Sequence, residues 1–276
     1  MNWAMRRAVL LLSVVGASIL VWATFVEPGR LVTHRRELTL TNWPRELSGL
    51  RVALLSDLHV GSPHWGARRL PELVDRVNEE HPDLVLLAGD FIANVYLGTW
   101  VSPEAIAEGL SGLRAPLGVL LVLGNHDGRF DYERVSAAFE AHGMRVLENQ
   151  LQMLEFHGHK LGVLGFADQM TRPQQVSGTL ALLPPGVSAL ALVHEPDVFM
   201  QLDDRVALTL AGHTHGGQVS LPWLGPLIIP SDYGKRFAAG HVVENGRQLF
   251  VTTGIGTSKL PVRLGVPPEI AILTLR

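Results

Sequence analysis

The run GVLLVLGNHD, residues 118–127, decides the fold of this chain. Five consecutive apolar residues, Val119 to Leu123, lead directly into Gly, Asn, His and Asp. A continuous apolar run of this length is expected for a strand that is covered on both faces, as in a parallel sheet. The polar residues would then lie at the carboxyl end of the strand, which is the edge where open α/β sheets bind ligands.

Four further runs have the same form, in which an apolar stretch ends in Asp, Glu or His, directly or after one Ser or Gly: RVALLSD (51–57), DLVLLAGD (83–90), ALALVHE (189–195) and RVALTLAGHTH (205–215). Amphipathic stretches between them predict helices over 70–77, over 103–113 with Ser102 as the cap, and over 131–142. The segment 144–166 alternates like paired strands. The sequence therefore predicts an α/β fold in which several strands deliver metal-binding side chains to one edge.

Composition limits the possible functions. The chain has 276 residues, of which 47% are hydrophobic, and this suits one large domain with a buried core plus an N-terminal segment. Its net charge of -3 gives no overall basic field, so no nucleic-acid partner is expected. The absence of cysteine excludes thiolate zinc sites, disulfides and cysteine nucleophiles. Recognition of any anionic group would have to come from a local site.

The N-terminal residues differ from the rest of the chain. The uncharged stretch 8–26 has nineteen residues, and at about 1.5 Å per residue it approaches the roughly 30 Å hydrocarbon thickness of a bilayer. We predict an uncleaved membrane anchor over 1–27, a linker over 28–49, and the main globular domain over 50–276. A buried core helix and a cleaved signal peptide are the alternatives.

The charges beside the apolar stretch suggest its orientation. Arg6 and Arg7 precede the stretch, and the positive-inside rule would keep them in the cytoplasm. The expected location is the cytoplasmic (inner) membrane, with the main globular domain on the outer face. Arg30, Arg35 and Arg36 on the other flank argue against this orientation. The Arg6–Arg7 pair also partly matches a twin-arginine export signal.

The polar residues at the predicted strand ends form an ordered series. Taken singly, each is also common in turns and helix caps. Together they read D-x-H, G-D, G-N-H-D, a single His and G-H-x-H, and the residues that could bind metal are Asp57, His59, Asp90, Asn125, His194, His213 and His215. This order resembles the calcineurin-like metallophosphoesterase superfamily, and the resemblance extends from about residue 50 to the C-terminus.

The resemblance implies a central β-sandwich flanked by helices, preceded here by a transmembrane helix. It also implies two divalent metal ions, one bound by Asp57, His59 and His215, the other by Asn125, His194 and His213, with Asp90 bridging both. Carboxylate, amide and imidazole donors favour Mn²⁺, with Zn²⁺ or Fe as alternatives. Two aspartates cannot neutralise four positive charges, so the site would attract a phosphate and a hydroxide.

The same resemblance implies a reaction, in which a metal-bridging hydroxide attacks phosphorus in line. Asn125 would also contact the phosphoryl oxygens. His126 would be the general acid for the leaving alkoxide, and Asp127 would orient the imidazole ring and keep it protonated. A structural role is the alternative for His126.

Two apolar loops, 91–101 and 221–230, follow metal-ligand motifs. They are either ordinary core and hairpin segments, or they rim the cleft and receive a lipid-borne phosphate. The C-terminal run 253–275 resembles a membrane-associated bacterial branch that includes phosphodiesterases and UDP-diacylglucosamine hydrolases. Lys259 and Arg263 in this run are candidate substrate contacts, and a structural role is equally open.

We therefore expect an enzyme, a metallophosphoesterase that cleaves a phosphodiester or a pyrophosphate. A lipid- or nucleotide-linked substrate such as UDP-diacylglucosamine is the candidate. A phosphomonoesterase or phosphoprotein phosphatase is the second hypothesis. A non-catalytic metal-binding scaffold is the third. The partners expected are a phosphorylated small molecule or lipid-linked substrate and the membrane, with no obligate protein partner.

Overall fold

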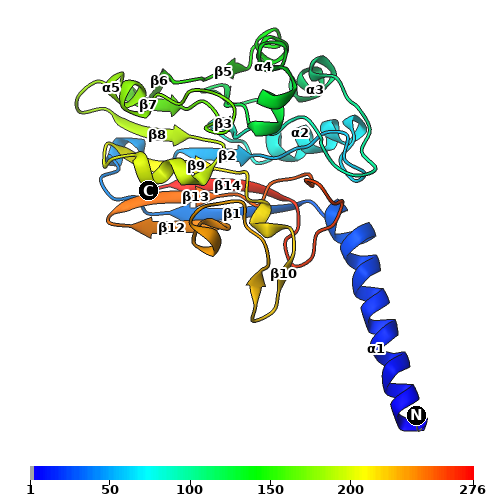
Figure 1. Ribbon diagram of the computed structural model, residues 1–276. Coiled ribbons are helices and arrows are strands. Elements are labelled where there is room, and N and C mark those ends of the chain that lie inside the picture. The colour runs from blue at the N-terminus through cyan, green and yellow to red at the C-terminus, as the bar shows by residue number, and fades with distance from the viewer. Residues whose placement is uncertain (1–2) are drawn as a thin grey trace.

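Two six-stranded β-sheets face each other at the centre of the molecule, and helices cover their outer faces (Figure 1). The computed structural model describes residues 3–276. The first sheet has the order β1-β14-β2-β3-β4-β5, and the second has the order β12-β13-β9-β8-β7-β6. The predicted α/β fold with a central β-sandwich is confirmed.

The first sheet comprises β1 (Val32–Leu38), β2 (Arg51–Leu55), β3 (Leu84–Leu87), β4 (Val119–Leu121), β5 (Arg145–Val146) and β14 (Glu269–Leu275). The second comprises β6 (Gln150–Phe156), β7 (His159–Gly165), β8 (Ser188–Leu192), β9 (Val206–Ala211), β12 (Gly240–Glu244) and β13 (Arg247–Val251). Strands β2 to β5 are parallel, as are β7, β8, β9 and β13. The carboxyl ends of the parallel strands therefore meet at one edge of the sandwich.

Alternation along each strand divides the core into layers. In β2, Val52 and Leu54 pack between the two sheets, whereas Ala53 and Leu55 pack against the helices of the first sheet. Successive side chains of a strand point to opposite faces, so a strand buried on both faces reads as a continuous apolar run. This explains why the five apolar runs were recognisable as core strands.

The helices that cover the first sheet are α2 (Leu70–Asn78), α3 (Pro103–Leu110) and α4 (Asn125–Glu140), and α5 (Val176–Ala181) packs on the second. The oxygen Oγ of Ser102 accepts a hydrogen bond from the N–H of Ala105, so the predicted cap of α3 is confirmed. Helix α4 begins six residues before the predicted start at Asp131. Asp131 itself has non-helical backbone angles and kinks the helix.

The expectation that residues 28–49 form a linker was wrong. Strand β1 lies within this segment and pairs in parallel with β14, from Val32 opposite Glu269 to Leu38 opposite Leu275. It is an edge strand, and its central side chains are charged and exposed. Charged side chains on an edge strand prevent pairing with other chains. Because of these charges, the strand lacks the apolar pattern by which core strands are identified in a sequence.

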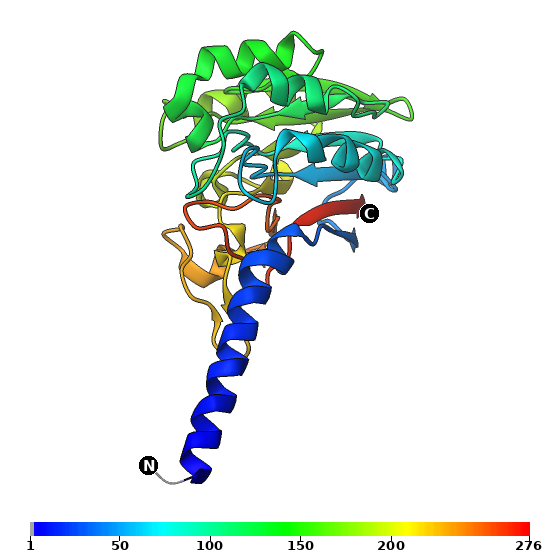
Figure 2. The same ribbon diagram turned by 90° about the vertical axis from the view of Figure 1, so that its right-hand side faces the viewer.

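The N-terminal helix α1 (Trp3–Val21) extends away from the sandwich in both views (Figures 1 and 2). The helical segment Trp3–Gly29 is long and apolar enough to cross a membrane, and its apolar window of 18 residues is almost entirely uncovered by the rest of the protein. A core helix would be covered, so the alternative of a buried core helix does not fit. A signal sequence would pass the same test of length and composition.

Candidate metal centre and active site

The candidate ligands lie where strands of both sheets end. Asp57, Asp90 and Asn125 follow β2, β3 and β4 of the first sheet, and His194 and His213 follow β8 and β9 of the second. The backbone has positive φ, between 41° and 68°, at five candidate ligands: Asp57, His59, Asp90, His213 and His215. Left-handed backbone is unusual for such residues and is concentrated at functional sites, where the surrounding structure must hold it.

One cluster consists of Asp57, His59 and His215, whose ligand atoms all lie within 4.8 Å of one another. Nε2 of His215 is 3.3 Å from Oδ1 of Asp57 and 3.2 Å from Nε2 of His59. Three donor atoms therefore converge on one small space.

A second cluster consists of Asp90, His194 and His213, again within 4.8 Å. Nδ1 of His213 is 3.2 Å from Nε2 of His194. Asn125 is buried and lines the same pocket as Asp90 and His213. The structure thus gathers six of the seven candidate ligands into two clusters and places the seventh beside the second.

Asp90 lies between the two clusters. Its Oδ2 is 3.6 Å from Nε2 of His59 and 3.3 Å from Nε2 of His194. Its other oxygen, Oδ1, accepts a hydrogen bond of 2.8 Å from the backbone N–H of His126. One oxygen is thereby fixed by the backbone, and the other faces a histidine from each cluster.

The donor set fits divalent metal ions. Oδ1 of Asp57 and Oδ1 of Asn125 are buried acceptors without a hydrogen-bond partner in the described chain, which is costly unless a cation satisfies them. Nδ1 of His59 lies 3.1 Å from the carbonyl of Ile92, and Nδ1 of His194 lies 2.6 Å from that of Ala88. A carbonyl can only accept, so each Nδ1 carries a proton, and each Nε2 faces the Asp90 carboxylate at the position where a metal could take the place of a proton.

Burial also prepares the site electrostatically. It lowers the pKa of His59 to about 4 and the pKa of His213 to about 3, so that both imidazoles are neutral at physiological pH. Burial raises the pKa of Asp57 to about 6. A buried carboxylate among neutral imidazoles is a site that a cation would stabilise.

The prediction that Asp127 orients the ring of His126 was wrong. Both carboxylate oxygens of Asp127 accept hydrogen bonds from backbone N–H groups, those of Asp90, Phe91, Ile92 and Gly124, at 2.8 to 3.0 Å. Burial raises the pKa of Asp127 to about 7, while these N–H donors favour its charged form. Asp127 therefore holds the loop that carries Asp90.

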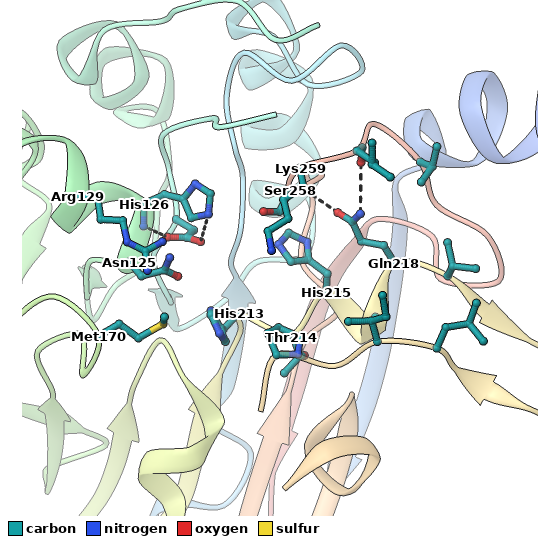
Figure 3. A pocket seen from close by; sticks show the side chains of 18 residues that line it. Asn125, His126, Arg129, Met170, His213, Thr214, His215, Gln218, Ser258 and Lys259 are labelled. Carbon is teal, nitrogen blue, oxygen red and sulfur yellow. Dashed lines mark hydrogen bonds and ion pairs between the residues drawn. The ribbon is translucent and has the colours of Figure 1, made fainter. Parts of the chain in front are cut away.

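His126 itself lies at the centre of the site. Its Nε2 is 3.9 Å from Oδ2 of Asp90, and its ring packs edge-on against the ring of His59 at 4.8 Å between centroids. It is partly exposed and lines the pocket (Figure 3). A proton donor for a substrate in the pocket could occupy this position.

The expectation that Arg263 contacts substrate was wrong. Its guanidinium is fully buried and donates to the backbone carbonyls of Gly256, Val266 and Thr253, the closest N–O distances being 2.6 to 3.0 Å. One guanidinium nitrogen also lies 3.4 Å from Nδ1 of His215. Arg263 is a structural residue of the C-terminal loop, whereas the other candidate, Lys259, lines the pocket (Figure 3).

A cavity of about 500 Å³ opens beside the clusters. Sequence reasoning missed four polar or flexible residues that line it, namely Arg129, Met170, Gln218 and Ser258 (Figure 3). Arg129 lies in the first turn of α4, four residues after Asn125, so helical spacing from the G-N-H-D motif could have identified it. The other three come from loops whose positions no sequence pattern indicated.

The two apolar loops have different positions. Leu227, Ile228 and Pro230 of the segment 221–230 form part of the cavity wall. None of the described residues in 91–101 lines the cavity, although this segment contacts the chain near Lys259 through the hydrogen bond from the N–H of Tyr96 to its carbonyl. Only the segment 221–230 therefore rims the pocket.

Comparison with known proteins agrees with this geometry. Residues 50–217 match the family model of the calcineurin-like phosphoesterases. The chain is 33% identical over 258 residues to the metallophosphoesterase YkuE of Bacillus subtilis, covering 92% of this chain and 89% of that protein. It is 29% identical to the phosphodiesterase YaeI of Escherichia coli, covering 91% and 90%. It is 26% identical to the UDP-2,3-diacylglucosamine pyrophosphatase LpxG of Chlamydia trachomatis, covering 95% of both chains.

The family match spans more than half of the chain and contains every candidate metal ligand. The relatives match over nearly their whole length, so the similarity is not confined to a shared motif. The chain therefore belongs to the calcineurin-like phosphoesterases, and it is a hydrolase of phosphoester bonds.

Proposed function

We propose that this protein uses two divalent metal ions to cleave a phosphodiester or pyrophosphate bond in a substrate with an apolar part. Asp57, His59 and His215 would hold one ion, and Asn125, His194 and His213 the other, with Asp90 between them. The observation that carries the proposal is the position of Oδ2 of Asp90, 3.6 Å from His59 and 3.3 Å from His194. Mn²⁺ is the proposed metal, because the donors are oxygen and imidazole nitrogen.

When bound, such ions would polarise the phosphoryl oxygens and lower the pKa of a coordinated water. The residues of the chain would orient the reacting group and exclude water from it. The backbone N–H of His126 fixes Oδ1 of Asp90, and Asp127 fixes the backbone of Asp90, so the central carboxylate cannot rotate freely. Rigid placement of charged groups is the main contribution of a protein to phosphoryl transfer.

His126 is the proposed proton donor to the leaving oxygen. It lines the pocket and is partly exposed, so a substrate could reach its ring. Its Nε2 stands near the central carboxylate, where a phosphoryl group between the two ions would present its ester oxygen. A proton delivered there would neutralise the leaving alkoxide or phosphate.

Lys259 and Arg129 are the proposed contacts to the substrate's phosphate groups. Both line the pocket. Within residues 3–276, neither side chain has an ion pair or hydrogen bond, so both charges are free for a ligand. Two cations beside the metal clusters favour a substrate with more than one phosphate charge, as in a pyrophosphate.

The apolar part of the substrate is inferred from the apolar residues of the pocket. Leu227, Ile228, Leu260 and Val262 also line it. The relative LpxG is named for hydrolysis of a diacylated sugar nucleotide, which has a pyrophosphate and acyl chains. A lipid-linked pyrophosphate or phosphodiester would match both the polar and the apolar lining. Helix α1 would anchor the protein in the cytoplasmic membrane with the catalytic domain on the outer face.

The proposal is tested with purified full-length protein in detergent. Elemental analysis should find two metal ions per chain, and chelation should abolish hydrolysis until Mn²⁺ is restored. Substrates should include aryl monoesters, aryl diesters, nucleotides and UDP-linked lipids. Higher kcat/KM for a diester or a lipid pyrophosphate than for any monoester is expected. Preference for a monoester would overturn the substrate class, and metal binding without turnover of any ester would indicate a scaffold.

A matched pair of variants separates the two roles within the site. His126→Gln should keep both metal ions and lose turnover, because the ring supplies no metal-binding atom in the proposal. His194→Gln should lose the second ion together with turnover. If His126→Gln also loses a metal ion, then His126 is a ligand and the proposed proton donor must be another group.

A further inference from the structure

A two-stranded hairpin projects from the body next to the pocket. Its strands are β10 (Ser220–Leu221) and β11 (Gly225–Pro226), which form a separate two-stranded sheet. The hairpin and the residues after it carry exposed apolar side chains: Trp223, Leu224, Leu227 and Ile228. Trp223 is fully exposed, and Ile228 is 77% exposed. A contiguous apolar surface of this kind marks an interaction site.

Trp223 occupies an unusual backbone position for a tryptophan. Its φ is 62°, in the left-handed region where glycine and asparagine are preferred. Within the described chain nothing covers its ring. The turn would form more readily with asparagine at this position, so local folding does not explain the tryptophan. Tryptophan is enriched where proteins meet the interface of a bilayer.

The hairpin and α1 project from the same side of the body. Both views place the segment around β10 below the sandwich, in the direction in which α1 leaves it (Figures 1 and 2). If α1 is the membrane anchor, this side of the domain faces the bilayer. The hairpin is then the part of the domain nearest to it.

The junction between α1 and the domain is held by buried hydrogen bonds. The carboxylate of Glu27, which is buried, accepts from Nε1 of Trp22 and from the backbone N–H of Val266, both at 2.8 Å. The N–H of Arg263 donates to the carbonyl of Ala23 at 2.9 Å. These bonds fix the end of the helix to the loop that carries Arg263. The direction of α1 is therefore coupled to the orientation of the pocket.

We propose that the hairpin 220–230 is a second membrane contact, which inserts Trp223 and Leu224 into the interface of the phospholipid bilayer that α1 crosses. The inference rests on the proposed anchoring by α1. Leu227 and Ile228 are exposed and also line the pocket, as does Leu260, so the bilayer surface would lie at the pocket mouth. A lipid-linked substrate could then present its phosphates to the metal centre without its acyl chains entering water.

The test uses the absence of cysteine in this chain, which allows a single introduced thiol to carry an environment-sensitive fluorophore. Three full-length variants are labelled and reconstituted in phosphatidylcholine and phosphatidylglycerol vesicles: Trp223→Cys in the hairpin, Leu12→Cys in α1, and Leu182→Cys after α5. Leu182 is the matched control, because it is an exposed leucine at the end of α5, which lies far from the hairpin in Figure 1. Quenchers attached to lipid and aqueous iodide are compared.

Lipid quenching of the Trp223 probe, strongest for a shallow quencher, is expected, because interfacial elements lie about 5–10 Å into the headgroup boundary. The Leu182 probe should be quenched by iodide alone. If the Leu12 probe is quenched by lipid and the Trp223 probe by iodide, the hairpin proposal fails while the anchor stands. If neither is quenched by lipid, both fail. Protection of the Trp223 probe from both quenchers would assign the hairpin to a second copy of the chain and overturn the proposal.

A second variant removes the apolar side chain without disturbing the turn. Trp223→Asn keeps a residue that tolerates positive φ. With the proposed lipid substrate in vesicles, KM should rise several-fold, while kcat/KM for a soluble aryl diester should stay unchanged. Equal losses on both substrates would indicate damage to the fold, and no loss on the lipid substrate would contradict a membrane role.

Discussion

The carboxylate of Asp127 accepts a hydrogen bond of 2.8 Å from the backbone N–H of Asp90, thirty-seven residues earlier in the chain. The same carboxylate also binds the N–H groups of Phe91, Ile92 and Gly124. It thus ties the loop after β3 to the start of α4. Asp90 has positive φ, and this clamp is what holds that backbone in place.

The clamp predicts that Asp127→Asn will damage metal binding. An asparagine would direct an NH2 group at N–H donors that now meet a carboxylate oxygen, and each buried donor left unpaired costs about 1–3 kcal/mol. We expect the metal-free protein to lose about 2 kcal/mol of unfolding free energy and the metal content to fall. Urea unfolding of the metal-free form and elemental analysis measure the two effects.

A contrary result would restore the role that sequence reasoning gave to Asp127. If Asp127→Asn keeps its metal ions and its stability but loses turnover to the same extent as His126→Gln, then the carboxylate acts through the imidazole. Measurement of both variants with the same preparation of metal separates the two explanations.

Gly124 permits the close approach of the two sheets at the site. A Cβ at this position would lie 2.3 Å from Oδ1 of Asp90 and 2.8 Å from Cε1 of His194. Gly124→Ala should therefore displace the central carboxylate and reduce kcat by at least about 100-fold, since small misplacements of reacting groups cost this much. Gly66→Ala is the control, because a Cβ there meets nothing within 4 Å and φ is negative. Similar activity of both variants would contradict the proposed geometry.

The strand ends of the active site could be predicted from the sequence for a physical reason. A strand buried on both faces must be continuously apolar, so the first polar residue after it marks the sheet edge, as at Asp57 and Asp90. In parallel strands these edges coincide, and the candidate ligands therefore meet. The same reasoning fails for β1, which is an edge strand with charged side chains.

The roles of Asp127 and Arg263 could not be predicted because they depend on which backbone groups lie within hydrogen-bonding distance of each side chain. Asp127 adjoins His126 in the sequence, but at the start of a helix adjacent side chains point in different directions, and Asp127 faces the loop after β3. Arg263 resembles a phosphate contact only in its residue type. Its carbonyl partners belong to a loop whose fold no local pattern specifies.

Arg263 and Lys259 should therefore respond differently to substitution. Arg263→Met leaves several buried carbonyls without donors, so we expect a loss of about 2–4 kcal/mol of unfolding free energy. Lys259→Met removes a pocket cation that has no partner in the described chain, so stability should stay within about 0.5 kcal/mol. Its KM for a pyrophosphate substrate should rise. Thermal unfolding and steady-state kinetics distinguish the two variants. An Arg263→Met variant of unchanged stability with a raised KM would place Arg263 at the substrate.

The Asp57 carboxylate should favour metal binding but lower the stability of the metal-free protein. Oδ1 of Asp57 is buried without a hydrogen-bond partner in residues 3–276, and Nε2 of His215 is 3.3 Å from it. In Asp57→Asn the buried charge would be absent, so the desolvation cost of the carboxylate would be removed. We expect the metal-free variant to gain about 1 kcal/mol in unfolding free energy.

The same variant should lose the stabilisation that metal confers on the unmodified protein. A ligand that binds only the folded state stabilises it by about 2.7 kcal/mol at a concentration 100 times its Kd. Mn²⁺ should therefore raise Tm of the unmodified protein and leave Tm of Asp57→Asn nearly unchanged. Calorimetry with and without Mn²⁺ measures this difference. A variant that is less stable without metal, yet still shifted by Mn²⁺, would mean that Asp57 supports the fold and that the ion binds without it.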